Sequence, residues 1–192
     1  QKKFLTAEWR KLIMANYIID PSVLIKYLPA KTEIDLWNGR CYVSLVGFLF
    51  QDARVKGLRV PCHVNFPEVN LRFYVRYREN NEWKRGVVFI SEIVPKPAIT
   101  FIANTIYREH YESMPMKYSW KNQEQSLVIN YQWKKKKKWN KLEVKADSMP
   151  TALQAGSCEE FIIEHFWGYS AFSKEKTGEY HVVHPRWDIY SV

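Results

Sequence analysis

The feature that most constrains the fold is a regular alternation of polar and apolar residues within the segment 64–77. Side chains of a β-strand point alternately to its two faces, so this pattern predicts one long strand with a polar face and an apolar face. The polar face carries Glu68, Asn70, Arg72, Tyr74 and Arg76, and the apolar face carries Val69, Leu71, Phe73 and Val75.

Further strands are predicted on both sides of this segment. Residues 9–19 are mostly apolar and stop before an Asp-Pro pair, which is typical of a strand that ends ahead of a proline. Asn38 and Gly39 lie between the segments 33–37 and 40–46, and this dipeptide predicts a two-residue hairpin turn. The remaining predicted strands cover residues 83–94, 117–120, 126–133, 139–146, 180–183 and 187–190.

Two or three short helices complete the prediction. Residues 21–28 begin with a proline, which the first turn of a helix tolerates. Residues 98–109 carry apolar side chains at helical spacing, and residues 159–166 form another short amphipathic segment. Strands in succession with so few helices predict an α+β fold dominated by antiparallel sheet. No internal repeat or linker divides the chain, so we expect a single domain over residues 1–192.

Length and composition favour a globular protein with a substantial core. A chain of 192 residues can fold without disulfides or metals, and eight Trp and twelve Tyr favour strands or a ring-lined cavity over a helical bundle. Cys41, Cys62 and Cys158 show no C-x-x-C spacing, which argues against a disulfide framework or a zinc ribbon. No stretch approaches the roughly 20 apolar residues of a membrane span. Residues 1–4 do not resemble the start of a signal peptide, so we expect a cytoplasmic protein.

The net charge of +9 is concentrated in one run of five lysines, from Lys134 to Lys138. Without them the net charge falls from +9 to +4. Lysines at a hairpin tip are well solvated, and they prevent edge-to-edge pairing of strands. The flanking Trp133 and Trp139 could instead stack on nucleic acid, but no recognition motif supports that interpretation. We therefore expect no specific nucleic-acid partner, and the role of the lysine run stays open.

Seven short stretches follow one another along almost the whole chain and form a specific ordered set. They read FLTAEWR at 4–10, LPAKTEID at 28–35, EVNLRFYV at 68–75, GVVF at 86–89, YREHY at 107–111, EFI at 160–162 and HPRW at 184–187. Together they resemble the YqjF-like family of uncharacterised conserved proteins. The resemblance implies an acetoacetate-decarboxylase-like fold, in which a curved, barrel-like sheet encloses a central cavity. Members of this family usually continue past the point where this chain ends, so the resemblance also implies a native chain that extends past Val192.

One segment contributes a candidate nucleophile. Residues 92–97 read Glu-Ile-Val-Pro-Lys-Pro, and Pro95-Lys96 is similar to the segment that carries the Schiff-base lysine of acetoacetate decarboxylase. Such a lysine has to be neutral to attack a carbonyl, and burial or a neighbouring cation favours the neutral form. In that enzyme a second lysine follows at once, whereas Pro97 follows here, so the resemblance does not extend to the activating cation. The alternative is a solvated lysine in a Pro-x-Pro turn.

The polar face of the strand at 68–76 contributes candidate binding residues. Arg, Asn and Tyr suit directional hydrogen bonding in a semi-enclosed site, whereas an ordinary amphipathic strand would turn this face to water. If the face points inward, Arg72 needs a carboxylate partner, because an unpaired buried charge is unfavourable. The candidate partners are Glu68, Glu92 and Glu164. We expect Lys96 and Glu68 to be catalytic, and the predicted ligand-binding residues are Arg72, Asn70, Tyr74, Arg76 and Glu92.

The histidines and cysteines do not form a metal or nucleophile site by spacing. His181 and His184 are three residues apart, which on a strand places their rings on opposite faces, so we expect no metal. His110 and His165 each lie near the end of a predicted helix, where the helix dipole favours a cation. Cys62 precedes a histidine, but neighbouring strand residues point apart, so a thiolate–imidazole pair is the weaker interpretation.

Two classes of function remain. The first is a cavity protein that binds or acts on a small anionic or carbonyl-containing organic molecule. The second is a non-catalytic structural or protein-interaction module with a basic surface loop. A deep polar cavity that reaches Glu68, Arg72 and Lys96 would favour the first class, and a filled interior would favour the second. We expect the first, with a small-molecule partner, no cofactor and no membrane, and with a homodimer among the open oligomeric states.

Overall fold

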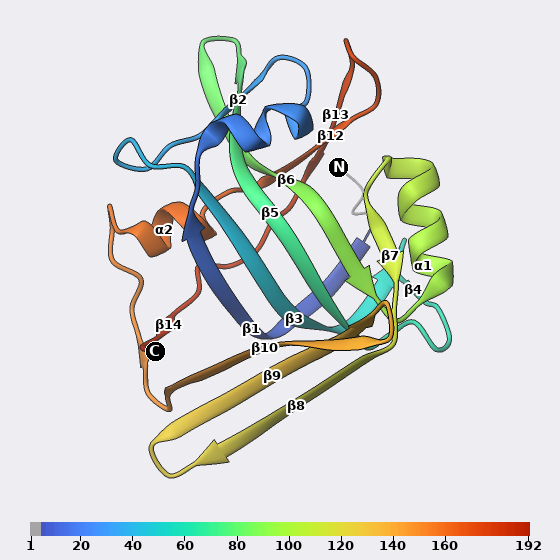
Figure 1. Cartoon of the computed structure of the whole chain (residues 1–192), viewed down its shortest axis with the longest axis vertical. Helices are drawn as coiled ribbons and strands as arrows, with labels where there is room; N and C mark the ends of the chain where they lie inside the picture. The colour runs from blue at the N-terminus through green and yellow to red at the C-terminus, as the bar shows by residue number, and fades with distance from the viewer. Residues whose placement is uncertain (1–4) are drawn as a thin grey trace.

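The structure of the chain is a computed structural model that describes residues 5–192 (Figure 1). Phe4, with which the first family-like stretch begins, lies outside the described residues, as does the rest of the segment 1–4. The helical segments are η1 (Pro21–Tyr27), α1 (Pro97–Ile102), η2 (Ala103–Tyr107) and α2 (Cys158–Ile163). The strands are β1 (Leu5–Ile18), β2 (Thr32–Ile34), β3 (Tyr42–Val55), β4 (Leu58–Arg59), β5 (Phe66–Glu79), β6 (Glu82–Val94), β7 (Tyr111–Ser113), β8 (Met116–Gln123), β9 (Ser126–Lys135), β10 (Lys138–Asp147), β11 (Pro150–Thr151), β12 (Trp167–Ala171), β13 (Thr177–His181) and β14 (Ile189–Tyr190).

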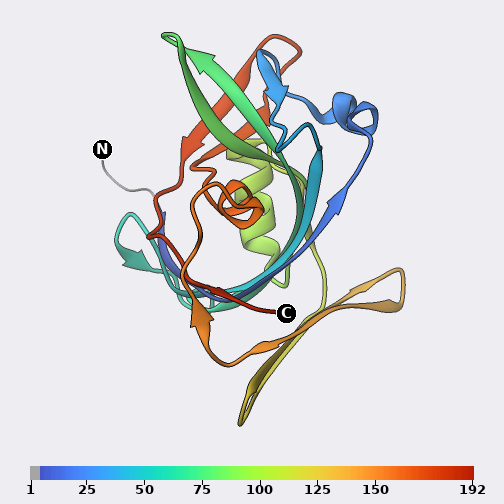
Figure 2. The same cartoon turned by 90° about the vertical axis from the view of Figure 1, so that its left-hand side faces the viewer.

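One strongly curved sheet dominates the molecule. Its strands follow the order β1-β3-β5-β6-β12-β13, and every neighbouring pair in this order is antiparallel except the parallel pair β6 and β12. In the described part of the chain β1 and β13 do not pair with each other, so the sheet stays open and does not close into the expected barrel. Figure 2 shows the sheet curving around α2. The strands β8, β9 and β10 form a second sheet that projects from the body (Figure 2).

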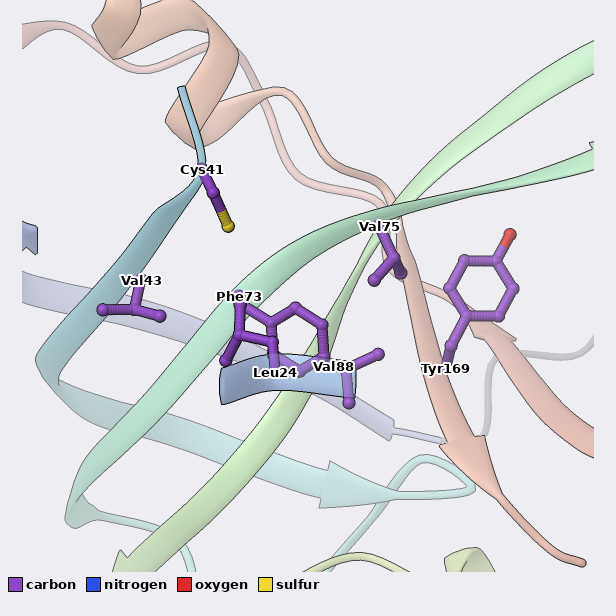
Figure 3. Packing of buried hydrophobic residues seen from close by; sticks show 7 residues of the cluster. All are labelled: Leu24, Cys41, Val43, Phe73, Val75, Val88 and Tyr169. Carbon is purple, nitrogen blue, oxygen red and sulfur yellow. The ribbon is translucent and has the colours of Figure 1, made fainter. Parts of the chain in front are cut away.

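The convex face of the curved sheet carries the alternating apolar residues that the sequence predicts on β5. Phe73 and Val75 are fully buried there and pack with Leu24 of η1. Figure 3 shows this cluster, whose buried members are Leu24, Cys41, Val43, Phe73, Val75, Val88 and Tyr169. Further along β5, Val69 packs with Tyr131 of the second sheet. The apolar face of β5 therefore fixes both η1 and the projecting sheet to the body.

The concave face is covered by the two short α-helices. Phe161 and Ile162 of α2 pack on Tyr74 of β5 and on neighbouring side chains of β3 and β6. Ile99 of α1 packs against the cluster that contains Val94. Because α2 buries Phe161 and Ile162 inside the curve and Ile99 of α1 is partly buried there, the two helices shield part of the concave face from water.

The predicted turn at Asn38 and Gly39 is confirmed, but the long hairpin around it is wrong. Both residues have positive φ, of 49° and 73°, and Trp37 and Arg40 form a single bridge across them. The flanking segments do not continue as partners, because β2 pairs with β5 while β3 pairs with β1 and β5. Long-range pairing has therefore overridden a strong local signal.

Two further hairpins join consecutive strands. Asn80 and Asn81 have positive φ between β5 and β6, and Lys136 and Lys137 do so between β9 and β10. The helix predicted over 98–109 is shorter and splits into α1 and the π-helical η2, after which Arg108 takes a left-handed conformation. Among the described residues, no helix is long and apolar enough to cross a membrane.

Candidate functional site

Strand β5 brings most of its predicted polar residues to the concave face. Glu68, Asn70 and Tyr74 are buried, with exposed fractions of 2%, 3% and 1%. Arg72 is half-buried. Arg76 departs from the prediction, because β5 continues to the rim of the sheet and Arg76 pairs there with Glu33 of β2.

Glu68 is an acid held in an apolar enclosure by two neutral donors. Asn70 Nδ2 donates a hydrogen bond of 2.9 Å to Oε1, and the Tyr111 hydroxyl donates one of 3.1 Å to Oε2. Burial raises the pKa of Glu68 to about 7, although these two donors and the charge of Arg72 act to lower it. At neutral pH, Glu68 is therefore present in both its protonated and its ionised form.

Two more glutamates extend this arrangement into a carboxyl cluster, defined here as Glu68, Glu92 and Glu109. Burial and the nearby charges of Glu68 and Glu109 raise the pKa of Glu92 well above its usual value. Burial likewise raises the pKa of Glu109 to about 7, against the hydrogen bonding of Tyr180. Three acids that share one low-dielectric site cannot all ionise, so the carboxyl cluster holds protons at neutral pH.

The two tyrosines of this site act as neutral donors. Burial and the neighbouring glutamates raise the pKa of Tyr111 and of Tyr180 well above the usual range. Glu109, Tyr111 and Tyr180 were not predicted as site residues, although the first two lie in the YREHY stretch at 107–111. Strand β7 brings Tyr111 beside Glu92 through parallel pairing with β6, which no local sequence pattern indicates.

Arg72 does not form the predicted ion pair. No carboxylate of the described chain lies within 4.0 Å of its guanidinium, which instead donates from Nη2 to the Met14 sulfur at 3.9 Å. Its Nε is buried without a hydrogen-bond partner, and the group lies 5.8 Å from the centre of the Tyr74 ring. The predicted ion pair is therefore wrong: the donors at hydrogen-bond distance from Glu68 are Asn70 and Tyr111, and the charge of Arg72 only acts to lower the pKa of Glu68.

Tyr74 has a supporting position in this structure. Its hydroxyl lies 2.5 Å from Ser44 Oγ, which in turn donates to Asn16 Oδ1 at 2.6 Å. The ring packs against His165, with 4.8 Å between the centroids. Tyr74 therefore ties three strands together beneath Arg72.

Lys96 follows directly after β6, the strand that carries Glu92, and it is half-buried. It is the residue before the first turn of α1, and its backbone carbonyl accepts from the amide and the hydroxyl of Thr100. Pro97 begins the helix, so the position of a second lysine is occupied by a residue with no charge. Lys96 thus lies at the junction between β6 and α1.

Asp35 is another buried acid that the sequence did not indicate as a site residue. Asp35 accepts a hydrogen bond of 2.6 Å from Arg85 Nε and lies 3.2 Å from His165 Nε2, and we call these three residues the Asp35 cluster. Burial acts to raise the pKa of Asp35, but the hydrogen bonds from His165 and Arg85 outweigh it and hold the pKa below its usual value. Burial lowers the pKa of His165, so the cation predicted at this helix end is wrong.

The remaining predicted features lie at the surface. Cys62 is exposed, and the ring of His63 contacts the Pro61 carbonyl at 2.8 Å. His181 stacks on Trp167, separately from His184. The lysine run forms the exposed tip of the β9–β10 hairpin. Among the described residues, no group of three or more His, Cys, Asp or Glu is arranged to hold a metal ion.

Neither of two surface pockets on the described residues is lined by Glu68, Arg72 or Lys96. The larger has a volume of about 380 Å³ and lies between the 36–38 loop and α2. The smaller, of about 300 Å³, is lined by Tyr77 and Tyr169 among others.

Comparison with known proteins assigns the sequence of this chain to a family. The model of the DUF2071 family, described as uncharacterized conserved proteins, matches residues 6–192. The uncharacterized protein YqjF of Bacillus subtilis (strain 168) is 34% identical over 84 residues, which cover 43% of this chain and 33% of YqjF. The matched stretch thus spans a third of that relative.

Solved structures show the fold. Acetoacetate decarboxylase from Legionella pneumophila is 16% identical with a TM-score of 0.59, and the match covers 88% of this chain and 58% of that one. The enduracididine biosynthesis enzyme MppR, solved in complex with pyruvate, is 12% identical with a TM-score of 0.61, over 92% of this chain and 63% of MppR. At such identities these similarities show an acetoacetate-decarboxylase-like fold and nothing finer.

Proposed function

Because the chain belongs to the DUF2071 family and has an acetoacetate-decarboxylase-like fold, we propose that its concave face binds and acts on a small keto acid. The observation that carries the proposal is the state of Glu68. A general acid or base works best when its pKa lies near the working pH, and burial raises the pKa of Glu68 to about 7. Asn70 and Tyr111 hold its two oxygens in place.

Arg72 supplies the group that binds the carboxylate of the keto acid. A guanidinium takes a carboxylate in two-point geometry, and the Nε of Arg72 is buried without a partner. Since no protein carboxylate lies within 4.0 Å, a bound anion would complete the hydrogen bonding of this side chain. The complex of MppR with pyruvate supports a ligand of this class for the shared fold.

Lys96 supplies the nucleophile in this proposal. In the neutral form that the reaction requires, its amine adds to the keto carbon of the ligand, and loss of water from the adduct gives a protonated imine. Protonated Glu68 gives its proton to the departing oxygen and is left as a carboxylate, which can accept a proton in the next step. The proposal does not include decarboxylation, because Pro97 stands where the activating cation would be.

The test is reductive trapping of the imine. The protein is incubated with pyruvate or acetoacetate, treated with borohydride and digested, and the modified lysine is identified by mass spectrometry. We expect an adduct on Lys96 that disappears in Lys96→Gln and persists in the control Lys174→Gln, which changes an exposed lysine. Glu68→Gln should slow trapping, and Arg72→Gln should raise the keto-acid concentration needed for half-maximal trapping. The absence of an adduct on Lys96 would refute the nucleophile.

A non-catalytic interaction module is the second candidate function. It is favoured by the enclosure of the carboxyl cluster and by the exposed aromatic pair Tyr118 and Trp120 on β8, whose rings stack at 5.8 Å. Neither of the two surface pockets reaches Glu68, Arg72 or Lys96, as a filled interior requires. The second candidate predicts no trapped adduct and no binding of pyruvate, which isothermal titration measures directly.

A further inference from the structure

The pocket between the 36–38 loop and α2 is independent of the carboxyl cluster. Its volume of about 380 Å³ is at the lower end of the range for small-molecule sites. No residue of the carboxyl cluster lines it, and Arg72 and Lys96 do not line it either. A ligand here would therefore form contacts that the proposed function does not use.

Arg85 is the fixed cation of this pocket. Its Nε donates to Asp35 at 2.6 Å, and its guanidinium lies 4.8 Å from the centre of the Phe161 ring. These two contacts hold the side chain in one orientation, and the protein hydrogen bonds of the described residues leave both Nη groups free. The side chain is 40% exposed, so the Nη groups remain available to an anion from solvent.

Glu164 is the free anion of the same pocket. Its Oε1 is buried and has no hydrogen-bond partner. Glu160, the other acid in the lining, is satisfied, because Arg186 Nη2 donates to it at 2.7 Å and the Gly156 amide donates to its second oxygen at 2.7 Å. Arg85 and Glu164 thus line one pocket without forming an ion pair within 4.0 Å of each other. Opposite charges held apart in this way match a ligand that carries both charges itself.

The rest of the lining is apolar on one side. Leu36, Trp37 and Phe161 contribute this surface, next to the two charged side chains. We propose that the pocket binds a small zwitterion of the α-amino-acid class with an apolar side chain. Its carboxylate binds the Nη groups of Arg85, its ammonium group binds Glu164, and its side chain packs on Trp37.

The experiment uses three matched probes on the intact protein. L-leucine carries both charges, 4-methylpentanoate lacks the ammonium group, and 3-methylbutylamine lacks the carboxylate. Binding is followed by ¹H–¹⁵N NMR, with the indole resonance of Trp37 assigned by a Trp37→Phe variant. We expect L-leucine to shift this resonance and to bind at least about tenfold more tightly than either analogue, since each analogue leaves one charge unpaired.

Variants locate the two charge contacts. Glu164→Gln and Arg85→Lys should each weaken L-leucine binding by about tenfold or more, and Arg85→Lys retains a cation for Asp35. The matched control Glu159→Gln, on an exposed position of α2, should bind as the wild type does. Arg72→Gln should also leave L-leucine binding unchanged, which separates this pocket from the proposed keto-acid site. The far-ultraviolet circular dichroism of each variant verifies that it is folded.

Three results would overturn the proposal. One is the absence of any shift of the Trp37 resonance at about 10 mM L-leucine, a concentration at which even weak ligands bind. Another is equal affinity for L-leucine and 4-methylpentanoate, which would make the pocket a simple anion site. The third is unchanged binding in folded Glu164→Gln, which would remove the ammonium contact.

Discussion

The chain buries carboxyl groups in the carboxyl cluster and in the Asp35 cluster, and their pKa values shift in opposite directions. In the carboxyl cluster, burial raises the pKa of Glu68 and of Glu109 to about 7, and no cation lies within 4.0 Å in the described chain. In the Asp35 cluster, hydrogen bonds from His165 and Arg85 hold the pKa of Asp35 below its usual value although burial acts to raise it. Burial acts in the same direction on all three acids, so the partner at hydrogen-bond distance decides the charge.

This difference separates a structural acid from a reactive one. Asp35 is ionised at neutral pH and joins the loop before Trp37 to β6 and to the end of α2. Glu68 is poised between its two forms and is held by neutral donors only. Perturbed pKa values of the second kind cluster at functional sites, which is why the proposed function rests on Glu68.

The largest expected effect comes from removing the charge of the Asp35 cluster. Asp35→Ala leaves His165 buried without its partner and Arg85 without its anchor. We expect a loss of about 3 kcal/mol in the free energy of unfolding, measured by urea denaturation at pH 7. The matched control Glu33→Ala breaks the exposed pair with Arg76 and should change stability by about 0.5 kcal/mol or less. Equal effects of the two variants would contradict the assigned role of Asp35.

A smaller effect on the free energy of unfolding is expected at Glu68, where stability falls as the pH rises. Its pKa is about 7 in the folded chain and about 4.5 when unfolded, so the folded state binds more protons between these values. Stability from this group is therefore lost as the pH rises from about 5 to 8, by roughly 2 kcal/mol. Glu68→Gln cannot ionise and should lack this loss, so the variant should gain stability relative to the wild type across that range.

The Asp35 cluster loses stability in the other direction. Because the pKa of Asp35 and of His165 is lowered in the folded chain, their contribution is present at higher pH and is lost on acidification. For His165 the loss begins below its ordinary pKa of 6.5, and for Asp35 it begins below its ordinary pKa of 3.8.

Urea denaturation of wild type and Glu68→Gln at each pH isolates the contribution of Glu68 to the free energy of unfolding. A constant difference between the two proteins from about pH 5 to 8 would contradict that contribution.

The smallest effect is expected at the lysine run, far from both clusters. Its lysines are exposed at the tip of the β9–β10 hairpin, and Lys135 pairs with Glu112 at the surface. Replacing Lys134 to Lys138 with serine should change the unfolding free energy by about 0.5 kcal/mol or less. Any nucleic-acid binding of the wild type should be weak and fall steeply with salt, as a filter-binding titration would show. Salt-resistant binding of one sequence would contradict this.

The sequence predicted those parts of the fold that depend on local patterns. The alternation along β5 correctly placed Glu68, Asn70 and Tyr74 together on one buried face. The Asn38-Gly39 dipeptide correctly marked a turn, in which both residues have positive φ. The hairpin around Asn38 was wrong because its flanking strands gain more by pairing with β1 and β5 than with each other. Such a preference depends on residues distant in the chain and leaves no local trace.

The candidate site was predictable only along a single strand. Asp35 and His165 are 130 residues apart in sequence and meet only because α2 covers the concave face. Tyr180 reaches the carboxyl cluster from β13, and Tyr111 reaches it through parallel pairing of β7 with β6. The predicted partner of Arg72 failed for a related reason, since the sequence does not show that Asn70 and Tyr111 occupy the two oxygens of Glu68.

The most direct test of this account is the ionisation of Glu68 itself. Carbon-13 NMR of the side-chain carboxyl resonances across pH 4 to 9, with Glu68→Gln used for assignment, reports the midpoint of its titration. The account predicts a midpoint of about 7, displaced when Glu92 or Glu109 is replaced by glutamine, because the three acids interact. A midpoint near the ordinary glutamate value of about 4.3 would contradict it and would remove Glu68 as the acid–base group.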